Sequence, residues 1–251
     1  MDLPECPAWF TVARMKSGYG QFCPVAVACE VFAERWTPMI LRELLAGSHR
    51  FNEIHRFIPL ISRTLLAKRL RELERAGVIT SAPAAKGPGR EYRLTESGEE
   101  FRELIKGLGN WGQRWTNRVQ PDNLNAGVLI WNIRRRVETE RLPARRLVVY
   151  FNFIGAPASY RGIRKFWLLL ERSGVDVCVT DPGFEVELYV DADLAAMTKV
   201  WLGDLAFAEA VRQKKIRMSG MPGMIRQFAS WLPLSPYAKV ARPGAAAREA
   251  A

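Results

Sequence analysis

The spacing of apolar residues changes near Leu147, and this change constrains the fold more than any other feature of the chain. Before it, apolar residues recur every three or four positions, as on one side of a helix. After it they alternate or run together, as in the strands of a half-buried sheet. The pattern predicts an α+β chain with a helical domain (18–118), a helical connector (119–146), a sheet-containing domain (147–236) and a tail (237–251).

The first domain is predicted to contain four short helices, at residues 25–33, 37–45, 51–57 and 62–76. Gly47 ends the second helix as a C-terminal cap, and Ser62 precedes the fourth as an N-terminal cap. Leu66, Leu70 and Leu73 recur at helical spacing, so they are expected to form the buried stripe of the fourth helix. The polar residues of this helix then lie on its other faces.

A hairpin and a long helix are predicted next. Strands at 78–80 and 91–94 flank a basic Gly/Pro-rich turn, residues 86–90, and Thr95 caps the helix that follows. The apolar residues of this helix share one side, namely Phe101, Leu104, Ile105, Leu108, Trp111 and Trp115. Helices, a hairpin wing and a long amphipathic helix follow each other in this order in a winged helix-turn-helix, in which the recognition helix enters the major groove of DNA.

Residues 62–76 would be the recognition helix, and double-stranded DNA would be the partner. Hydroxyl and basic side chains suit phosphates and guanine edges. The candidate DNA-binding residues are Ser62, Arg63, Thr64, Lys68 and Arg71 on the helix, Lys86 and Arg90 on the wing, and Arg50 before the third helix. The plainer alternative is a solvated helix face, on which Arg69 and Arg75 pair with Glu72 and other carboxylates.

The residues from about 18 to 115 closely resemble the HxlR family of bacterial transcriptional regulators, which are relatives of the MarR type. The resemblance rests on Cys23-Pro24, Trp36, the run Arg50-Phe51-Asn52-Glu53-Ile54, and Leu70-Arg71-Glu72-Leu73-Glu74 before Gly77. It implies a homodimeric repressor or activator that binds DNA, with dimer contacts from the N-terminal helix and from the helix after the wing.

Cys23 is a redox-sensing candidate, because several members of this family sense oxidants through a cysteine at the matching position. Free cysteine is more often a small buried hydrophobe, and no histidine or basic cluster near Cys23 in the sequence predicts a lowered pKa. The four cysteines form no C-x-x-C pair and the chain has two histidines, so neither a metal nor a cofactor is expected. A nucleotide-binding use of Gly107-Leu108-Gly109-Asn110-Trp111-Gly112 is rejected, because this run lies inside a helix, where close helix packing across a dimer suits its glycines better.

The second domain is predicted to pair strands at 147–153, 163–170, 175–180, 184–190 and 216–219 with helices at 192–202, 204–214 and up to Trp231. It resembles the lipid-binding domain of sterol carrier protein type 2, over residues 147–236. The resemblance implies an apolar tunnel, for which the candidate lining residues are Phe166, Leu168, Val186, Leu188, Met197, Trp201, Met218, Met221, Met224, Phe228 and Trp231. An ordinary packed core would use the same residue types.

The sequence thus predicts a cytoplasmic, non-enzymatic regulator with double-stranded DNA, a second copy of itself and an apolar or lipid-like small molecule as partners, and without membrane insertion. A lipid or small-molecule carrier whose winged helix binds proteins is the alternative, and an enzyme is a third. The net charge of +11 suits an anionic partner. Both halves share this charge, because residues 1–120 hold 18 basic and 13 acidic side chains and residues 121–251 hold 19 and 13.

Overall fold

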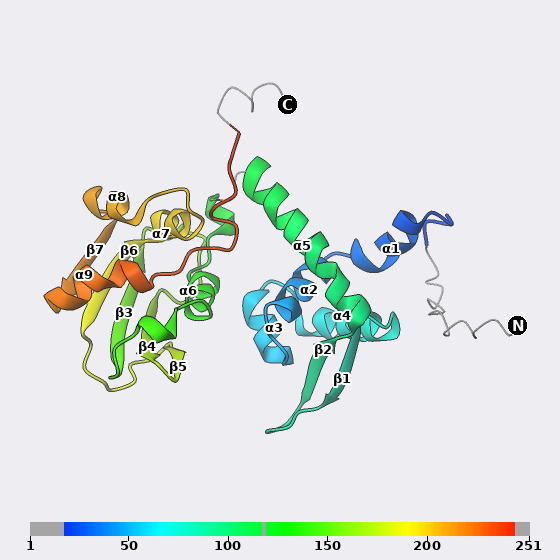
Figure 1. Ribbon diagram of the computed structural model, residues 1–251, viewed down its shortest axis with the longest axis horizontal. Helices are drawn as coiled ribbons and strands as arrows, with labels where there is room; N and C mark the ends of the chain where they lie inside the picture. Colours follow the sequence, from blue (N-terminus) through cyan, green and yellow to red (C-terminus); the bar gives the residue numbers. More distant parts are fainter. Residues whose placement is uncertain (1–17, 117–118, 244–251) are drawn as a thin grey trace, which may run out of the picture. The chain divides into compact units, whose positions relative to one another are not determined.

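The computed structural model describes residues 18–116 and 119–243, and its contacts divide the chain into two units, Met1–Leu108 and Gly109–Ala251. The first unit holds four helices, a two-stranded hairpin and the start of a long helix (Figure 1). These elements are α1 (Pro24–Phe32), α2 (Thr37–Leu45), α3 (Phe51–Phe57), α4 (Arg63–Arg75), β1 (Ile79–Pro83), β2 (Arg90–Leu94) and α5 (Glu96–Trp115). The order is that of a winged helix-turn-helix, as predicted.

Local sequence sets the ends of these helices. Gly47 follows α2 with a φ of 89°, a conformation that glycine adopts without steric cost. The Ser62 hydroxyl accepts the Leu65 N–H at 3.2 Å and so caps α4. Thr95 caps α5 in the same way, accepting the Gly98 N–H at 3.2 Å. These three predicted ends are confirmed.

The core of the first unit is built on the predicted leucine stripe. Leu66, Leu70 and Leu73 are all buried, and they pack in one cluster with Ile40 and Ile54 from α2 and α3. Strands β1 and β2 pair in antiparallel register from Ile79↔Leu94 to Pro83↔Arg90. The buried side of α4 is therefore fixed to the domain, which leaves its opposite side at the surface.

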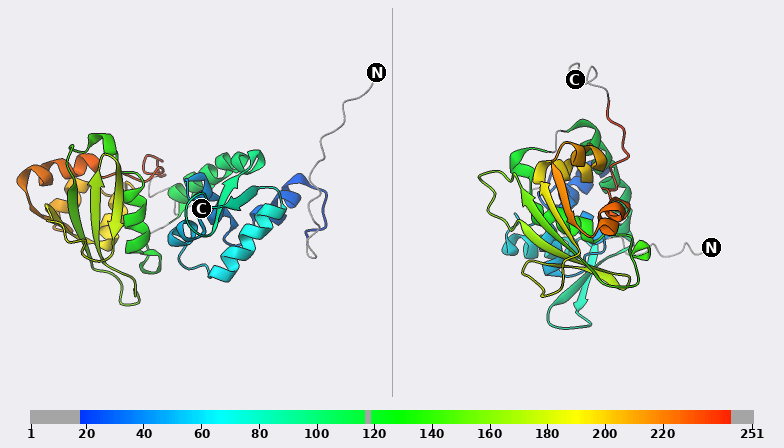
Figure 2. Two further views of the ribbon diagram at one scale, coloured as in Figure 1. Left: turned by 90° about the horizontal axis from the view of Figure 1, so that it is seen from below. Right: turned by 90° about the vertical axis from the view of Figure 1, so that its left-hand side faces the viewer.

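The second unit contains a five-stranded sheet in the order β5-β4-β3-β6-β7 (Figure 2). The β3–β6 pair is parallel and the other pairs are antiparallel. The strands are β3 (Leu147–Ile154), β4 (Lys165–Glu171), β5 (Gly174–Cys178), β6 (Leu188–Asp193) and β7 (Ile216–Gly220). The helices are α6 (Ala126–Arg134), α7 (Leu194–Trp201), α8 (Phe207–Arg212) and α9 (Pro222–Trp231), with short 3₁₀ turns at Pro121–Asn123 and Thr139–Arg141.

Alternate residues of the strands face the helices. Phe151, Phe166, Leu168 and Val190 are buried in one cluster with residues of α6, α7 and α9. Every second residue of a strand lies on the same side of the sheet, so these apolar residues form one face. The predicted mixed domain with an apolar sheet face is therefore present.

One predicted strand is displaced. Residues 184–190 are predicted to be extended, but β6 begins only at Leu188. The Glu187 carboxylate accepts the Val148 N–H at 2.7 Å, and the Glu187 N–H donates to the Val148 carbonyl at 3.1 Å. A side chain thus accepts the hydrogen bond that a backbone carbonyl of the ladder would accept, and Val186 lies outside the sheet.

Helix α6 was expected in the connector, but it packs into the second unit. Its buried residues Ala126, Leu129, Ile130 and Ile133 belong to the same cluster as the sheet. This apolar side explains the difference, because it needs a partner surface and the sheet supplies one. The segment therefore contributes to the core of the second unit.

Part of the expected tail also packs. Arg242 pairs with Asp204 at 2.8 Å, and the Tyr237 ring lies so close to Gly109 that a Cβ at Gly109 would clash with it. Gly109 thus serves a contact within the chain, whereas the sequence suggested a contact between two copies. Residues 244–251 lie outside the described residues. Among the helices that the structure describes, none is long and apolar enough to cross a bilayer.

Candidate functional site

The exposed side of α4 carries the predicted hydroxyl and basic residues. Thr64, Lys68 and Arg71 are exposed and recur at positions i, i+4 and i+7, so they form one stripe opposite the buried leucines. Lys68 lies 3.7 Å from Glu72, a loose exposed pair that leaves the ammonium group accessible. Arg71 has no ion-pair partner among the residues described.

Arg63 opens α4 and is oriented by α3. Its guanidinium donates to the Asn52 side-chain carbonyl at 3.0 Å and lies 5.7 Å from the centre of the Phe51 ring. Both contacts leave Arg63 exposed while limiting its side-chain freedom. The structure therefore brings Arg63 to the same end of α4 as the capping Ser62.

Arg69 differs from its neighbours because it is buried. Its guanidinium pairs with Glu34 before α2, and it donates to Glu72 at 2.7 Å. This agrees with the alternative interpretation of Arg69, in which the side chain pairs with Glu72. Arg69 joins α4 to the rest of the domain and is not a surface cation.

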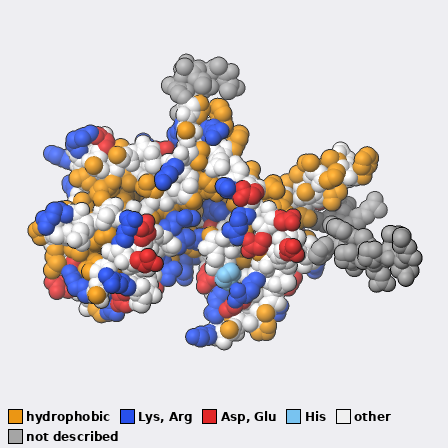
Figure 3. Space-filling view, in the orientation of Figure 1, with side chains coloured by type: hydrophobic (Ala, Val, Ile, Leu, Met, Phe, Trp, Pro, Cys, Tyr) orange, Lys and Arg blue, Asp and Glu red, His pale blue; other side chains and the backbone are white. Residues whose placement is uncertain are grey.

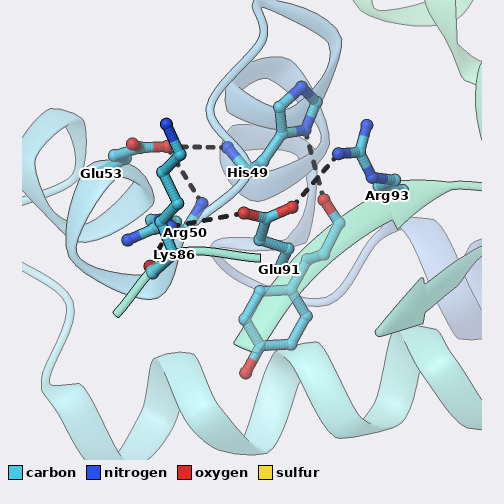
Figure 4. Close-up of polar contacts among 7 residues, drawn as sticks. His49, Arg50, Glu53, Lys86, Glu91 and Arg93 are labelled. Carbon is cyan, nitrogen blue, oxygen red and sulfur yellow. Dashed lines mark hydrogen bonds and ion pairs between the residues drawn. The ribbon is translucent and has the colours of Figure 1, made fainter. Parts of the chain in front are cut away.

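The wing is held by a polar cluster that includes Arg50 (Figure 4). The Arg50 guanidinium donates to the Lys86 carbonyl at 2.6 Å and lies 3.4 Å from the Glu91 carboxylate, which also pairs with Arg93 at 3.1 Å. An isolated bridge joins the backbones of Arg50 and Glu91. Arg50 was predicted to bind phosphate, and the structure places it between α3 and the wing.

Glu53 and His49 complete this cluster from the α3 side. The Glu53 carboxylate accepts the backbone N–H groups of His49 at 2.9 Å and of Arg50 at 3.0 Å. The His49 ring lies 3.3 Å from the Tyr92 carbonyl, and the Tyr92 N–H donates to the His49 carbonyl at 2.8 Å. The start of α3 and strand β2 are therefore one connected unit.

Glu91 is the shared acceptor of the cluster. Burial raises the pKa of its carboxyl, but hydrogen bonds from Arg93 and Arg50 outweigh this and hold the pKa below its ordinary value. The carboxylate is therefore ionised at neutral pH, and each of its two arginines keeps a charged partner.

The turn at the wing tip carries Lys86, and Arg90 lies beside this turn at the start of β2, paired with Pro83. Lys86 is exposed in the turn closed by the Ala84 N–H donating to the Gly89 carbonyl. Arg90 donates to the Ser81 hydroxyl at 2.6 Å, and this hydroxyl donates to Glu74 of α4 at 2.6 Å. Arg90 thus links the wing to α4 while remaining exposed.

Sequence reasoning missed Asn52, Glu53, Ser81 and Glu91. The acidic residue three positions after Arg50 has the spacing of a helix N-terminal box, so Glu53 had a visible signal. The roles of Asn52, Ser81 and Glu91 depend on partners from other elements, which a single sequence does not reveal.

Cys23 lies exposed at the N-terminal cap of α1. The nearby backbone N–H groups of Ala26 and then Val25 lower the pKa of its thiol. The sequence predicted no lowering because no cation lies nearby, but here the free backbone donors of the helix start replace a cation.

The candidate ligand-lining residues divide between core and surface. Seven are buried, Val186, Trp201 and Met218 are half-buried, and Met221 is 46% exposed. The buried set is Phe166, Leu168, Leu188, Met197, Met224, Phe228 and Trp231.

Phe228 lies at the centre of this core. Its ring packs against those of Phe151, Phe207 and Trp231 at centroid distances of 5.9, 5.7 and 6.0 Å. The cavity beside it measures about 10 Å³. A single water needs at least about 10–15 Å³ on this measure, so the core at this point is packed.

An exposed basic helix followed by a hairpin is the arrangement of a winged helix-turn-helix domain, which is found in transcriptional regulators. Here hydrogen bonds hold the hairpin against α3 and α4. Residues 31–120 match the HxlR-like helix-turn-helix family. The HTH-type transcriptional regulator YdeP of Bacillus subtilis is 35% identical over 105 residues, 41% of this chain and 80% of YdeP. A regulator of the same type from Methanothermobacter thermautotrophicus is 37% identical over 94 residues, 37% of this chain and 72% of the relative.

Two solved structures are similar to the same part of the chain. The redox regulator HypR in its reduced form is 31% identical, with a TM-score of 0.34, and the match covers 36% of this chain and 90% of HypR. Reduced YodB from B. subtilis is 32% identical, with a TM-score of 0.33, and the match covers 37% of this chain and 93% of YodB. On the sequence relationships above, the chain belongs to the HxlR-like helix-turn-helix family and is a transcriptional regulator of that type.

Proposed function

We propose that this protein is a homodimeric, DNA-binding regulator in which α4 enters the major groove and the β1–β2 wing contacts the flanking backbone. The observation that carries the proposal is the two-sided character of α4. Leu66, Leu70 and Leu73 fix one side in the core, while Thr64, Lys68 and Arg71 are exposed on the other. A helix held in this way presents its side chains to a groove with little further ordering.

The residues at the start of α4 suit two kinds of contact. The Ser62 hydroxyl accepts the Leu65 N–H and still has its own proton to donate to a phosphate. Arg63, oriented by Asn52, has free donors for a phosphate or for the O6 and N7 atoms of guanine. Lys68 and Arg71 extend the contact along the helix.

The wing supplies the second contact. Lys86 in the turn and Arg90 beside the turn are exposed cations that suit phosphates. Arg50 acts through the wing, because its hydrogen bond to the Lys86 carbonyl holds the turn in place. Arg50 is therefore a positioning residue in this proposal.

The homodimer is supported by apolar side chains left exposed on α5 and before α1. Leu104, Leu108, Trp111 and Trp115 are 55%, 48%, 61% and 47% exposed along one side of α5, and Phe22 is 99% exposed. Contiguous apolar surface of this kind marks an interaction site. A two-fold dimer would cover the same surface on both copies.

For the second unit we propose a sterol-carrier-like domain that binds an apolar effector. The one-sided sheet and its aromatic core around Phe228 support this assignment. Because the cavity there is about 10 Å³, the core would have to open for an effector to enter at this point. A ligand that binds the open and closed domains unequally shifts the affinity for DNA by that difference and no more.

Duplex from upstream of the protein's own gene, titrated at several salt concentrations against a shuffled duplex, tests the regulator. We expect specific binding that Arg63→Ala and Lys68→Ala weaken and that Lys199→Ala, a change of an exposed lysine in the second unit, leaves intact. Binding that is indifferent to sequence and to the first two changes would favour a carrier protein. Native mass spectrometry of freshly purified protein tests for a retained apolar ligand.

A further inference from the structure

The sheet of the second unit brings together cations from segments that are distant in the sequence. Lys165 of β4 pairs in register with Asn152, Asn152 with Asp191, and Asp191 with Arg217 of β7. Adjacent strands lie about 4.8 Å apart, so the Cα atoms of Lys165 and Arg217 are about 14 Å apart in one row.

More cations adjoin the ends of this row. We define the basic rim as Arg161, Arg164, Lys165, Arg212, Lys214, Lys215 and Arg217, all of which are exposed. Figure 3 shows Lys and Arg side chains gathered over α8. Arg212 is the last residue of this helix, and Lys214 and Lys215 follow it before β7.

Few carboxylates oppose the basic rim. Arg212 pairs with Glu209. Asp191 accepts a hydrogen bond from the Asn152 side chain, and Asp193 caps α7 by accepting the Ala196 N–H. Within the described ranges, Lys165, Lys214, Lys215 and Arg217 form no ion pair, so their charges remain available to an anionic partner.

The backbone at Lys214 gives an independent indication. Its N–H donates to the Val211 carbonyl and the Lys215 N–H donates to the Ala210 carbonyl, both at 2.9 Å. This closes α8 in the manner that normally places glycine at the position of Lys214. Lys214 has a φ of 58°, which costs a residue with a side chain more than it costs glycine. A side chain is therefore kept at a position where glycine would be less strained.

We propose that the basic rim binds the phosphates of double-stranded DNA beyond the segment that α4 and the wing contact. The proposal rests on the proposed function, because a duplex held by the first unit raises the effective concentration of phosphates around the second. A row of about 14 Å spans roughly four phosphates of one strand at about 3.4 Å each. Tyr150, Trp167 and Tyr189 pack together on the same sheet face beside this row. The cations of the basic rim itself suit the phosphates of a nucleic-acid backbone.

The test compares two duplexes, the shortest upstream duplex that retains specific binding and the same duplex extended by 20 base pairs on each side. We expect the extension to strengthen binding about tenfold at 0.1 M salt and to steepen the salt dependence. The change Lys214→Gln with Lys215→Gln should remove this gain without weakening binding to the short duplex. The matched control, Lys199→Gln with Lys239→Gln, removes two exposed lysines outside the basic rim and should keep the gain.

Lys214→Gly separates binding from folding. It relieves the backbone at φ 58°, so the melting temperature should hold or rise while the gain from the extension falls. Equal affinity for both duplexes in the native protein, or a gain that survives the lysine changes, would overturn the proposal while leaving specific binding to the short duplex intact. Failure to bind either duplex would instead overturn the proposed function.

Two further outcomes would give the basic rim a role other than DNA binding. Lysine-dependent binding to phosphatidylglycerol vesicles without an effect of duplex length would identify a membrane surface as the partner. Aggregation of the lysine variants with unchanged DNA binding would mean that these charges only protect the edge strand β7 from pairing.

Discussion

The Arg50 guanidinium donates a hydrogen bond of 2.6 Å to the carbonyl of Lys86, so a residue at the start of α3 holds the turn of the wing 36 positions later. The same guanidinium lies 3.4 Å from Glu91. Arg50 therefore helps to hold the turn of the wing, and in this role it need not contact DNA itself.

Replacing Arg50 should loosen the wing. Arg50→Met removes both contacts, and we expect a loss of about 1 kcal/mol of unfolding free energy, since the pair is partly exposed. Hydrogen exchange of residues 84–90 should become faster and DNA binding weaker. Arg93→Met, which removes the other partner of Glu91, is the control and should leave the turn protected. Equal exchange in the two variants would show that Arg50 does not hold the wing.

The Glu91 cluster should respond to acid. Its pKa lies below the ordinary value, so its contribution to stability is complete above the pKa of the unfolded chain and is lost as the pH falls through the pKa of the folded state. The difference in unfolding free energy between the native protein and Glu91→Gln should be largest near pH 7 and shrink below about pH 4. Urea titrations at several pH values measure it. A difference that stays constant with pH would refute the role of Glu91.

Cys23 should react as a thiolate. Its pKa is lowered by backbone N–H groups at the start of α1 and its side chain is exposed, so alkylation at pH 7 should be faster than for the half-buried Cys178. Peptide mapping after a short iodoacetamide pulse resolves the cysteines, and Cys23→Ser identifies the Cys23 peptide. Equal labelling of Cys23 and Cys178 would remove the physical basis for Cys23 as a sensor.

The exposed side of α5 should mediate dimer formation. Trp111→Glu places a charge within the apolar stripe, and we expect a folded monomer in sedimentation experiments because Trp111 is not part of the core. Glu103→Lys also changes a charge on α5 but lies off the stripe, so it should leave the dimer intact. A Trp111→Glu protein that remains dimeric would place the interface elsewhere.

The sequence predicted the elements of the first unit well because their signals are local. Ser62, Gly47 and the leucine stripe of α4 act within one or two helical turns. It placed α6 in a connector because apolar spacing identifies a helix without naming the surface against which it packs. The β6 start and the Arg50 contact were missed for the same reason, since Glu187 bonds to Val148 and Arg50 to a backbone carbonyl 36 residues away.

Arg69 and Arg71 lie on the same helix, but replacing Arg69 should lower stability and replacing Arg71 should not. Arg69 is buried between Glu34 and Glu72, so Arg69→Ala should cost about 2–3 kcal/mol of unfolding free energy by leaving Glu34 without its ion-pair partner and Glu72 with only the loose contact to Lys68. Arg71 is exposed, so Arg71→Ala should change stability by less than about 0.5 kcal/mol. Urea unfolding of both variants tests this contrast, which would fail if the two losses were equal.

The dissociation constant of Arg71→Ala for the specific upstream duplex tests the central claim, that the exposed side of α4 recognises DNA. With the fold intact, we expect the dissociation constant to rise about 5- to 150-fold, the effect of removing one base or phosphate contact of about 1–3 kcal/mol. Lys199→Ala, measured beside it, should bind as the native protein does. An unchanged dissociation constant for Arg71→Ala and for Lys68→Ala would contradict the account.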